Sequence, residues 1–337
     1  MQIGNGMEQV SVRKIKIVTI GGGTGQSTLL VGLKQNPWLD ISALVTPYDS
    51  GGSSVKLRDR FGILPPGDIF RCILALAPEK DQPTLRNIFK RRLAYNHTLG
   101  NIFLLGAQAI YSDYQKAINE ICKTFSANGQ VFPVSLERSN LCAELDDGTY
   151  VKQETDIDQA IRNGRDIVRL FLDPVVDAHK QALKAIREAD LICLGPGSFY
   201  TSVLAPLLTR GIQDALKATN APIIFVMNLL TEGLGMTNYD CWKFYNTLSQ
   251  YTGRRINRIV VNSLMPKKSL LQKYKTKENK SPVSVANIST DNKLFEIAPL
   301  WAKGRYARHD PGKLGDLISA IAYDLVGKGR ISISDGR

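Results

Sequence analysis

The sequence contains little cysteine and no long apolar run. Its five cysteines are odd in number and lie at least 20 residues apart, so their spacing supports neither a disulfide framework nor a Cys-x-x-Cys metal site. No stretch approaches 18 consecutive apolar residues, and residues 1–10 lack the hydrophobic region of a signal peptide. We therefore expect a cytoplasmic protein that has no membrane partner.

Internal repeats and low-complexity segments are also absent. The chain has 337 residues, of which 43% are hydrophobic, 22% are charged and 28 are glycine, close to the averages of globular proteins. This composition excludes disordered, collagen-like and coiled-coil proteins. We expect one α/β domain over residues 14–326, between a flexible lead-in at 1–13 and a flexible tail at 327–337.

Positive charge is concentrated at one end of the chain. The formal net charge is +12, and residues 251–337 carry 17 basic and 7 acidic side chains, so 17 − 7 = +10 of it lies in the last quarter. Such an excess can attract polyanions, including nucleic acid. No nucleic-acid-binding motif accompanies it, however, and a solvated loop and helix face is the preferred interpretation.

Strand and helix patterns alternate along the chain. Residues 15–20 form a β-branched run that stops at glycines, and apolar residues then recur to Leu33, which predicts a strand, a glycine turn and a helix. Further strands are expected at 41–45, 167–172, 190–194, 222–227 and 258–261, with helices at 177–188, from the 195–198 loop to 218, and at 237–251 and 312–325. This alternation predicts a doubly wound α/β fold with a mainly parallel sheet.

Two regions depart from that alternation. Residues from about 80 to 130 lack clear strands and show helical spacing, so we expect a helical layer or insertion there. Residues 131–136 and 142–151, with a turn at Asp147-Gly148, predict a small β excursion.

Glycine-rich turns follow two of the predicted strands. Residues 21–25 (Gly-Gly-Gly-Thr-Gly) allow backbone N–H groups to approach an anion at a helix N-terminus. Neither the G-x-G-x-x-G dinucleotide fingerprint nor the Walker P-loop is matched. Residues 195–202 (Gly-Pro-Gly-Ser-Phe-Tyr-Thr-Ser) again join a strand to a helix. We therefore expect the two turns to bind one diphosphate between them, an arrangement called here a split phosphate clamp. Alternatively, either turn could simply connect a strand to a helix.

Polar residues gather in other loops. Asp49, Ser50, Gly51, Gly52, Ser53 and Ser54 could hold Mg²⁺ through Asp49 or bind sugar and phosphate oxygens, or they could form an ordinary turn. Asp68 is expected to be the N-cap of a helix, with Arg71 one turn later facing a phosphate. A lone histidine more often has a structural role, but the titration range of His97, beside a helix start, makes it a candidate proton donor. We expect residues 308–311 (Arg-His-Asp-Pro) to lie at the surface.

Six segments together resemble the gluconeogenesis-factor family, which is related to 2-phospho-L-lactate transferase. They occur in that family's order between about residues 14 and 314, at 21–25, 49–54, 64–68, 99–101, 195–202 and 308–311. The combination is specific, although each segment alone is short. The resemblance implies a Rossmann-like α/β fold with a ligand crevice.

The resemblance also implies function. In the gluconeogenesis-factor branch the ligand is a UDP-sugar such as UDP-N-acetylglucosamine, and the role is regulatory, in carbon metabolism and in cell-wall synthesis or cell shape. In the transferase branch a phospholactyl group passes from a nucleotide diphosphate donor to a deazaflavin alcohol with Mg²⁺. The segments at 195–202 and 65–68 are more similar to the first branch.

The first interpretation is therefore nucleotide-sugar binding without turnover. The glycine turns would take the two phosphates, Asp49, Ser53 and Ser54 the sugar or ribose, and the Asn228 amide the uracil edge. The ligand-binding candidates are Gly22, Gly23, Thr24, Gly25, Asp49, Gly51, Gly52, Ser53, Ser54, Asp68, Arg71, Asn101, Gly195, Gly197, Ser198, Tyr200, Thr201 and Asn228.

Two alternatives stay open. A Mg²⁺-dependent transferase would use Asp49 and Asp68 to position the metal, and Asp49 or His97 to deprotonate the attacking alcohol. Both branches usually carry two adjacent acidic residues before the double glycine, whereas Asp49 is followed here by Ser50, so one hard oxygen ligand is missing. Binding of nucleic acid through the basic last quarter is the less favoured alternative, and a homodimer remains open.

Overall fold

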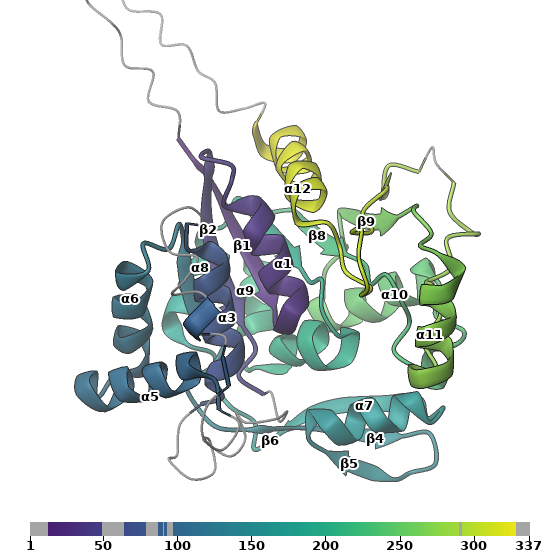
Figure 1. Ribbon diagram of the computed structural model, residues 1–337, viewed down its shortest axis with the longest axis horizontal. Coiled ribbons are helices and arrows are strands. Elements are labelled where there is room, and N and C mark those ends of the chain that lie inside the picture. Colours follow the sequence, from purple (N-terminus) through teal and green to yellow (C-terminus); the bar gives the residue numbers. More distant parts are fainter. Residues whose placement is uncertain are drawn as a thin grey trace, which may run out of the picture.

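The computed structural model describes residues 13–48, 64–78, 87–89, 91–92, 97–289 and 292–327. Its main element is a seven-stranded sheet with the order β10-β9-β8-β7-β1-β2-β3, in which every neighbouring pair is parallel (Figure 1). The strands are β1 (Ile15–Gly21), β2 (Leu39–Val45), β3 (Gln130–Pro133), β7 (Leu191–Leu194), β8 (Ile223–Val226), β9 (Arg258–Asn262) and β10 (Phe295–Ala298).

Both faces of this sheet are buried, which explains its continuous apolar strands. Successive residues of a strand point to opposite faces. Ile15 and Ile17 of β1 accordingly pack into one hydrophobic core, and Val18 and Ile20 pack into the other. A strand that is buried on both sides reads as a run of Ile, Val and Leu rather than as an alternating pattern.

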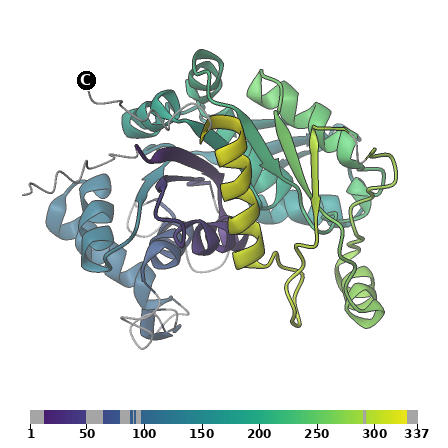
Figure 2. The same cartoon turned by 90° about the horizontal axis from the view of Figure 1, so that it is seen from above.

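Helices cover each face, as the doubly wound fold requires. The core on one face includes side chains of α1 (Gly23–Leu33), α3 (Pro66–Leu76), α5 (Leu99–Tyr111), α6 (Tyr114–Thr124) and α12 (Pro311–Val326). The opposite core includes side chains of α8 (Lys180–Glu188), α9 (Ile212–Ala218) and α10 (Cys241–Thr252). Figure 2 shows α12, in yellow, beside α1. The expected Rossmann-like α/β class is confirmed, and α5 and α6 supply the helices expected between 80 and 130.

A small antiparallel sheet forms no strand pairing with the main one but shares the hydrophobic core that includes α8, α9 and α10. It has the order β5-β4-β6 and consists of β4 (Asn140–Leu145), β5 (Tyr150–Lys152) and β6 (Ile167–Asp173). The turn expected at Asp147-Gly148 joins β4 to β5, with Gly148 at φ +79°. Helix α7 (Glu154–Arg162) follows and lies against this sheet below the main one (Figure 1).

The structure corrects several expected elements. Residues 131–136 do not join the small β excursion, because β3 pairs with β2 at the edge of the main sheet. The helix expected from the 195–198 loop to 218 is interrupted: a π-helical turn (Phe199–Leu204) and a 3-10 turn (Ala205–Leu208) precede α9. Pro206 lacks an N–H group, and Gly211 has φ +92°, so a continuous α-helix cannot pass through them.

Three elements were not expected. Helix α11 (Lys268–Glu278) and strand β10 lie where the sequence shows no clear period of apolar residues, whereas α7 is short and its helical period consists of only three residues, Ile157, Ala160 and Ile161. No residue of α11 is buried. Within the described residues, no helix combines the length and the apolar character needed to cross a bilayer.

Candidate functional site

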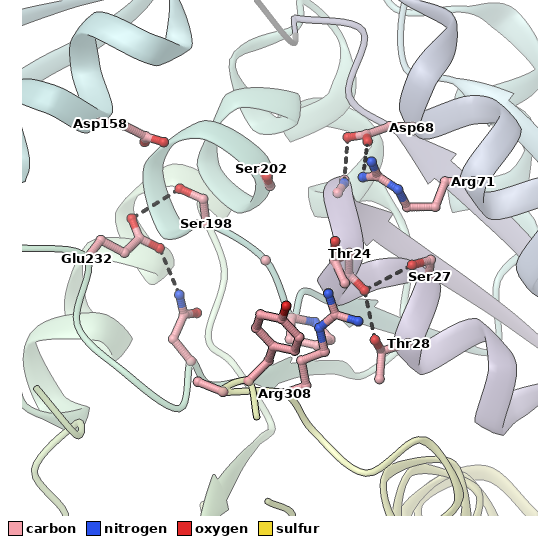
Figure 3. A pocket seen from close by; sticks show the side chains of 18 of the residues that line it. Thr24, Ser27, Thr28, Asp68, Arg71, Asp158, Ser198, Ser202, Glu232 and Arg308 are labelled. Atoms are coloured by element: carbon pink, nitrogen blue, oxygen red, sulfur yellow. Dashed lines mark hydrogen bonds and ion pairs between the residues drawn. The ribbon is translucent and has the colours of Figure 1, made fainter. Parts of the chain in front are cut away.

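A cleft of about 1160 Å³ opens at the carboxyl ends of β1, β7 and β8. The chain leaves β1 toward β2 and leaves β7 toward β8, so the sheet's strand order reverses between these two neighbours. Ligands of open α/β sheets bind at such a switch point. Figure 3 shows Thr24 and Asp68 on one side of the cleft, Ser198 and Glu232 on the other, and Arg308 reaching in between them.

The two glycine turns meet in this cleft, as the split-clamp hypothesis requires. A Cβ atom added to Gly25 would lie 2.3 Å from the carbonyl oxygen of Pro196, and one added to Gly197 would lie 3.5 Å from the carbonyl oxygen of Gly22. The backbones of the turns are therefore in direct contact, and glycine is what allows this approach.

A carboxylate covers the start of α1. Oδ2 of Asp68 accepts a hydrogen bond from the N–H of Gly23 at 2.5 Å, and its Oδ1 pairs with the Arg71 guanidinium at 2.6 Å. Asp68 lies in the first turn of α3, whose N-cap is Pro65, so its expected N-cap role in that helix is wrong. Its carboxylate instead accepts a hydrogen bond from the N-terminus of α1. The positive end of α1 attracts a carboxylate for the same reason that it would attract a phosphate.

A second carboxylate covers the other turn. Glu232 accepts hydrogen bonds from the N–H of Phe199 at 2.5 Å, from the Ser198 hydroxyl at 3.1 Å and from the Asn228 amide at 2.8 Å. These bonds fix the 196–199 turn from the side of β8. Both turns of the clamp are thus stabilised by an acidic side chain from elsewhere in the chain.

The ionisation of Glu232 is perturbed by its position. Burial raises the pKa of this carboxyl to about 7, and the neighbouring Asp158 carboxylate adds to the rise, while the hydrogen bond from Phe199 and the charge of Lys280 oppose it. The pKa in the folded protein therefore lies above the ordinary value of 4.5, so folding favours the protonated form.

Glu232→Gln is expected to flatten the pH dependence of stability above pH 4.5. The contribution of Glu232 is fully present below pH 4.5 and is lost as the pH rises through about 7, because the folded state binds this proton more tightly. Thermal unfolding should therefore show the Tm of the wild-type protein falling relative to that of the variant over this range. Glu188→Gln should act in a different pH range and with the opposite sign: Lys16 lowers the pKa of exposed Glu188 below 4.5, so its contribution is present above pH 4.5 and is lost as the pH falls below that value. Parallel Tm profiles for the wild-type protein and Glu232→Gln would contradict the assignment.

The structure brings most of the described ligand-binding candidates to the cleft. They are Gly22, Gly23, Thr24, Gly25, Asp68, Arg71, Asn101, Gly197, Ser198 and Asn228. Asp49, Gly51, Gly52, Ser53 and Ser54 lie outside the described residues.

Four candidates do not line the cleft. Gly195 has φ +73° and forms the bend that leads into the turn. Tyr200 and Thr201 are buried: the Tyr200 hydroxyl bonds to that of Tyr239, and the Thr201 hydroxyl donates to Glu154 at 3.2 Å. His97 lies outside the cleft wall, near the start of α5.

Several cleft residues were missed by the sequence analysis. Glu154, Asp158 and Arg162 come from α7, and Glu232 follows β8. The spacing of Glu154 and Asp158 places them on one helix face, but nothing in the sequence says which face meets the cleft. Arg308 and His309 also line it. Arg308 is exposed, as expected for residues 308–311, whereas His309 is only 7% exposed, so its expected surface position is wrong.

The charge of the cleft is mixed. Five basic side chains line it, Arg71, Arg92, Arg162, Lys280 and Arg308, together with five acidic ones, Asp68, Glu154, Asp158, Glu232 and Glu278. Among the residues that the structure describes, no group of three or more His, Cys, Asp or Glu side chains could hold a metal ion.

Comparison with known proteins gives consistent results. The family profile of 2-phospho-L-lactate transferase CofD matches residues 17–298. The chain is 37% identical to a putative gluconeogenesis factor of Aquifex aeolicus, over 92% of this chain and 97% of that protein. It is 36% identical to the gluconeogenesis factor of Bacillus subtilis, over 91% of this chain and 98% of that protein.

A solved structure agrees with the fold. The crystal structure of a UPF0052-family protein from Bacillus halodurans superposes with a TM-score of 0.83 at 34% identity, covering 91% of this chain and 99% of that one. The profile spans most of the chain, and the sequence relatives match it almost end to end. The chain therefore belongs to the CofD family and, by its similarity to these relatives, to the gluconeogenesis factors.

Proposed function

We propose that this protein binds a nucleotide sugar of the UDP-N-acetylglucosamine type and acts as a regulator of carbon metabolism and of cell-wall synthesis or cell shape. The observation that carries the proposal is the contact of two glycine turns in one cleft at the switch point of a parallel sheet. The names of the gluconeogenesis factors support the link to carbon metabolism.

The diphosphate would lie over the two turns. Asp68 already occupies the N–H of Gly23, and Glu232 occupies that of Phe199. The N–H groups of Thr24 and Gly25 precede the first hydrogen bond of α1, from Gln26 to the carbonyl of Gly22 at 3.4 Å, so no carbonyl within the helix accepts them. These two groups suit one phosphate, and the 197–198 turn suits the other.

Arg308 supplies the positive charge that a diphosphate needs. Its side chain extends from the segment before α12 into the middle of the cleft (Figure 3). It packs against the Tyr306 ring, with the guanidinium carbon 5.3 Å from the ring centroid. A guanidinium can bind two phosphate oxygens at once, so Arg308 would close the clamp opposite α1.

Isothermal titration with UDP-N-acetylglucosamine tests the proposal. We expect the wild-type protein to bind this ligand and Arg308→Gln to bind it about tenfold more weakly, because a charge-assisted hydrogen bond contributes roughly 1.5 kcal/mol. Arg187→Gln, which changes an arginine outside the cleft, should leave the affinity unchanged. The proposal fails if the wild-type protein binds no UDP-sugar, or if both variants weaken binding equally.

The match to the CofD profile favours a second candidate function, transfer of a phospholactyl-type group. Such a transferase would need Mg²⁺ on a nucleotide diphosphate donor. Both oxygens of Asp68 are already engaged by Gly23 and Arg71, so the described residues do not by themselves fit a magnesium site. Incubation with a nucleotide-diphosphate phospholactate donor, a deazaflavin alcohol and Mg²⁺ separates the two functions, because only the transferase would accumulate product with time.

A further inference from the structure

Two buried side-chain atoms without a hydrogen-bond partner belong to residues that line the cleft. They are Oδ1 of Asn228 and Nε2 of His309, and neither has a partner among the described residues. Both residues line the cleft. A buried polar atom without a partner is uncommon in native proteins and often marks a place where a ligand supplies the missing group.

The local structure determines that His309 presents an acceptor. Its imidazole forms a hydrogen bond with the backbone of Met227. The N–H of Met227 already donates to Val260 in the sheet at 3.0 Å, so the imidazole must donate to the Met227 carbonyl. Because Nε2 has no partner, the donor is Nδ1, and Nε2 keeps its lone pair in the neutral ring.

The protonation state agrees with this tautomer. His309 is 93% buried, and burial lowers its pKa to about 4, although the bond to Met227 acts in the opposite direction. The ring is therefore neutral at physiological pH. Its single N–H group already donates a hydrogen bond to the Met227 carbonyl.

Asn228 is oriented in a comparable way. Its amide NH₂ group donates to Glu232 at 2.8 Å, and this carboxylate also accepts from Phe199 and Ser198. Rotating the amide would bring its oxygen against Oε1 of Glu232, which already accepts a hydrogen bond from the N–H of Phe199. Oδ1 is therefore the amide atom that has no partner. Since residue 228 follows Met227 directly, the two acceptors come from one small region of the wall.

We propose that Asn228 and His309 form a subsite that binds hydroxyl groups of the ligand, with Oδ1 and Nε2 accepting hydrogen bonds from them. This inference rests on the proposed binding of a nucleotide sugar and assigns one part of it. Phosphate oxygens are acceptors and would repel both atoms. In uracil the N3–H group is flanked by two carbonyl acceptors, so its edge cannot satisfy two neighbouring acceptors. A vicinal diol offers two donors whose hydrogens can rotate, and ribose and hexose both carry one.

The tautomer of His309 can be measured without any ligand. Nitrogen-15 NMR of the free protein should show His309 protonated at Nδ1 only, and His309→Asn identifies its signals among the three histidines of the chain. On addition of UDP-N-acetylglucosamine, or of ribose 5-phosphate as a nucleotide-free probe, the Nε2 signal should move as it accepts a hydrogen bond. A proton on Nε2 in the free protein would overturn the subsite.

Two substitutions separate an acceptor from a merely structural role. In His309→Asn, the side-chain NH₂ group can still donate to the Met227 carbonyl, but no acceptor remains at the position of Nε2. In His309→Gln, an amide oxygen can take the position of Nε2, but the hydrogen bond to Met227 is lost. By titration calorimetry we expect Asn at 309 to weaken UDP-N-acetylglucosamine binding about threefold to tenfold, and Gln to restore part of the affinity. Binding of inorganic diphosphate should be unchanged in both variants, and His179→Asn, outside the cleft, should match the wild-type protein.

Deoxy ligands identify the source of the hydroxyl. If the ribose occupies the subsite, 2′-deoxy-UDP binds the wild-type protein more weakly than UDP does. His309→Asn should then not weaken the binding of 2′-deoxy-UDP any further. If the hexose does, His309→Asn weakens binding of UDP-N-acetylglucosamine but not of UDP. If Gln at 309 weakens ligand binding more than Asn does, the residue has a structural role and the proposal is refuted. It is also refuted if the substitutions affect the binding of GDP alone, because the two acceptors would then bind a base. If no UDP compound binds the wild-type protein, the proposed function fails, and the tautomer and ribose 5-phosphate measurements still decide the subsite.

Discussion

Gly25→Ala is expected to weaken nucleotide-sugar binding about a hundredfold. The added methyl group would lie 2.3 Å from the carbonyl oxygen of Pro196 and 2.9 Å from the backbone nitrogen of Gly197. Backbone atoms cannot rotate away, so the two turns must separate. The ligand would then lose contact with one turn or the other, and two charge-assisted hydrogen bonds of about 1.5 kcal/mol each correspond to this factor.

Calorimetric titration and chemical denaturation should be measured on the same Gly25→Ala preparation. We also expect a loss of about 1–3 kcal/mol in the free energy of unfolding, because inserting atoms into a packed contact is destabilising. Gly106→Ala is the matched control, since its added Cβ, also on a helix, would have no heavy atom within 4 Å. Wild-type affinity in Gly25→Ala would mean that the ligand does not bridge the turns.

Gly315→Ala is expected to destabilise the protein by about 3 kcal/mol. Helix α12 crosses α1 at two glycines, and a Cβ atom on Gly315 would lie 2.4 Å from the carbonyl carbon of Gly32. A Cβ atom on Gly32 would lie 2.0 Å from the carbonyl oxygen of Pro311. Either methyl group forces the helices apart and opens the core that Leu29, Leu33, Leu314 and Ile318 share.

Urea denaturation of the full chain measures this effect. Gly312→Ala, in the same helix, is the control: its Cβ would make only an ordinary contact at 3.5 Å with Asp310, so its free energy of unfolding should change by less than about 1 kcal/mol. The double variant Gly32→Ala and Gly315→Ala should lose less than the sum of the single losses, because both methyl groups separate the same pair of helices. Equal stabilities of Gly312→Ala and Gly315→Ala would show that the crossing tolerates a wider spacing.

The central strands could be predicted closely from the sequence. The strand expected at 15–20 is β1 (Ile15–Gly21), and that expected at 258–261 is β9 (Arg258–Asn262). Such strands are buried on both faces and bounded by turn residues, so the apolar run and the flanking turn residues indicate the same boundaries. Edge elements were harder to predict. Strand β10 has only four residues, and its Ile297 is 37% exposed, so its pattern does not stand out from a loop.

The site was predictable only in part. Glycine turns after strands are recognisable because a close backbone approach requires glycine, and Gly22, Gly25 and Gly197 do meet in the cleft. The roles of Asp68 and Glu232 could not be predicted, because the N–H groups that they bind, those of Gly23 and Phe199, lie 45 and 33 residues away along the chain. A carboxylate that serves a distant helix N-terminus has no local signature.

The sequence by itself determined the α/β class, the central strands and the turns that can approach an anion, because these depend on short-range periodicity and on the conformational freedom of glycine. Only the tertiary structure decided which turns meet, which acidic side chains cover them, and that Arg308 and His309 face the same cleft from the far end of the chain. The physical reason is that strand order, not sequence order, sets the neighbours at the edge of a sheet. Here β1 and β7 lie side by side with about half of the chain between them.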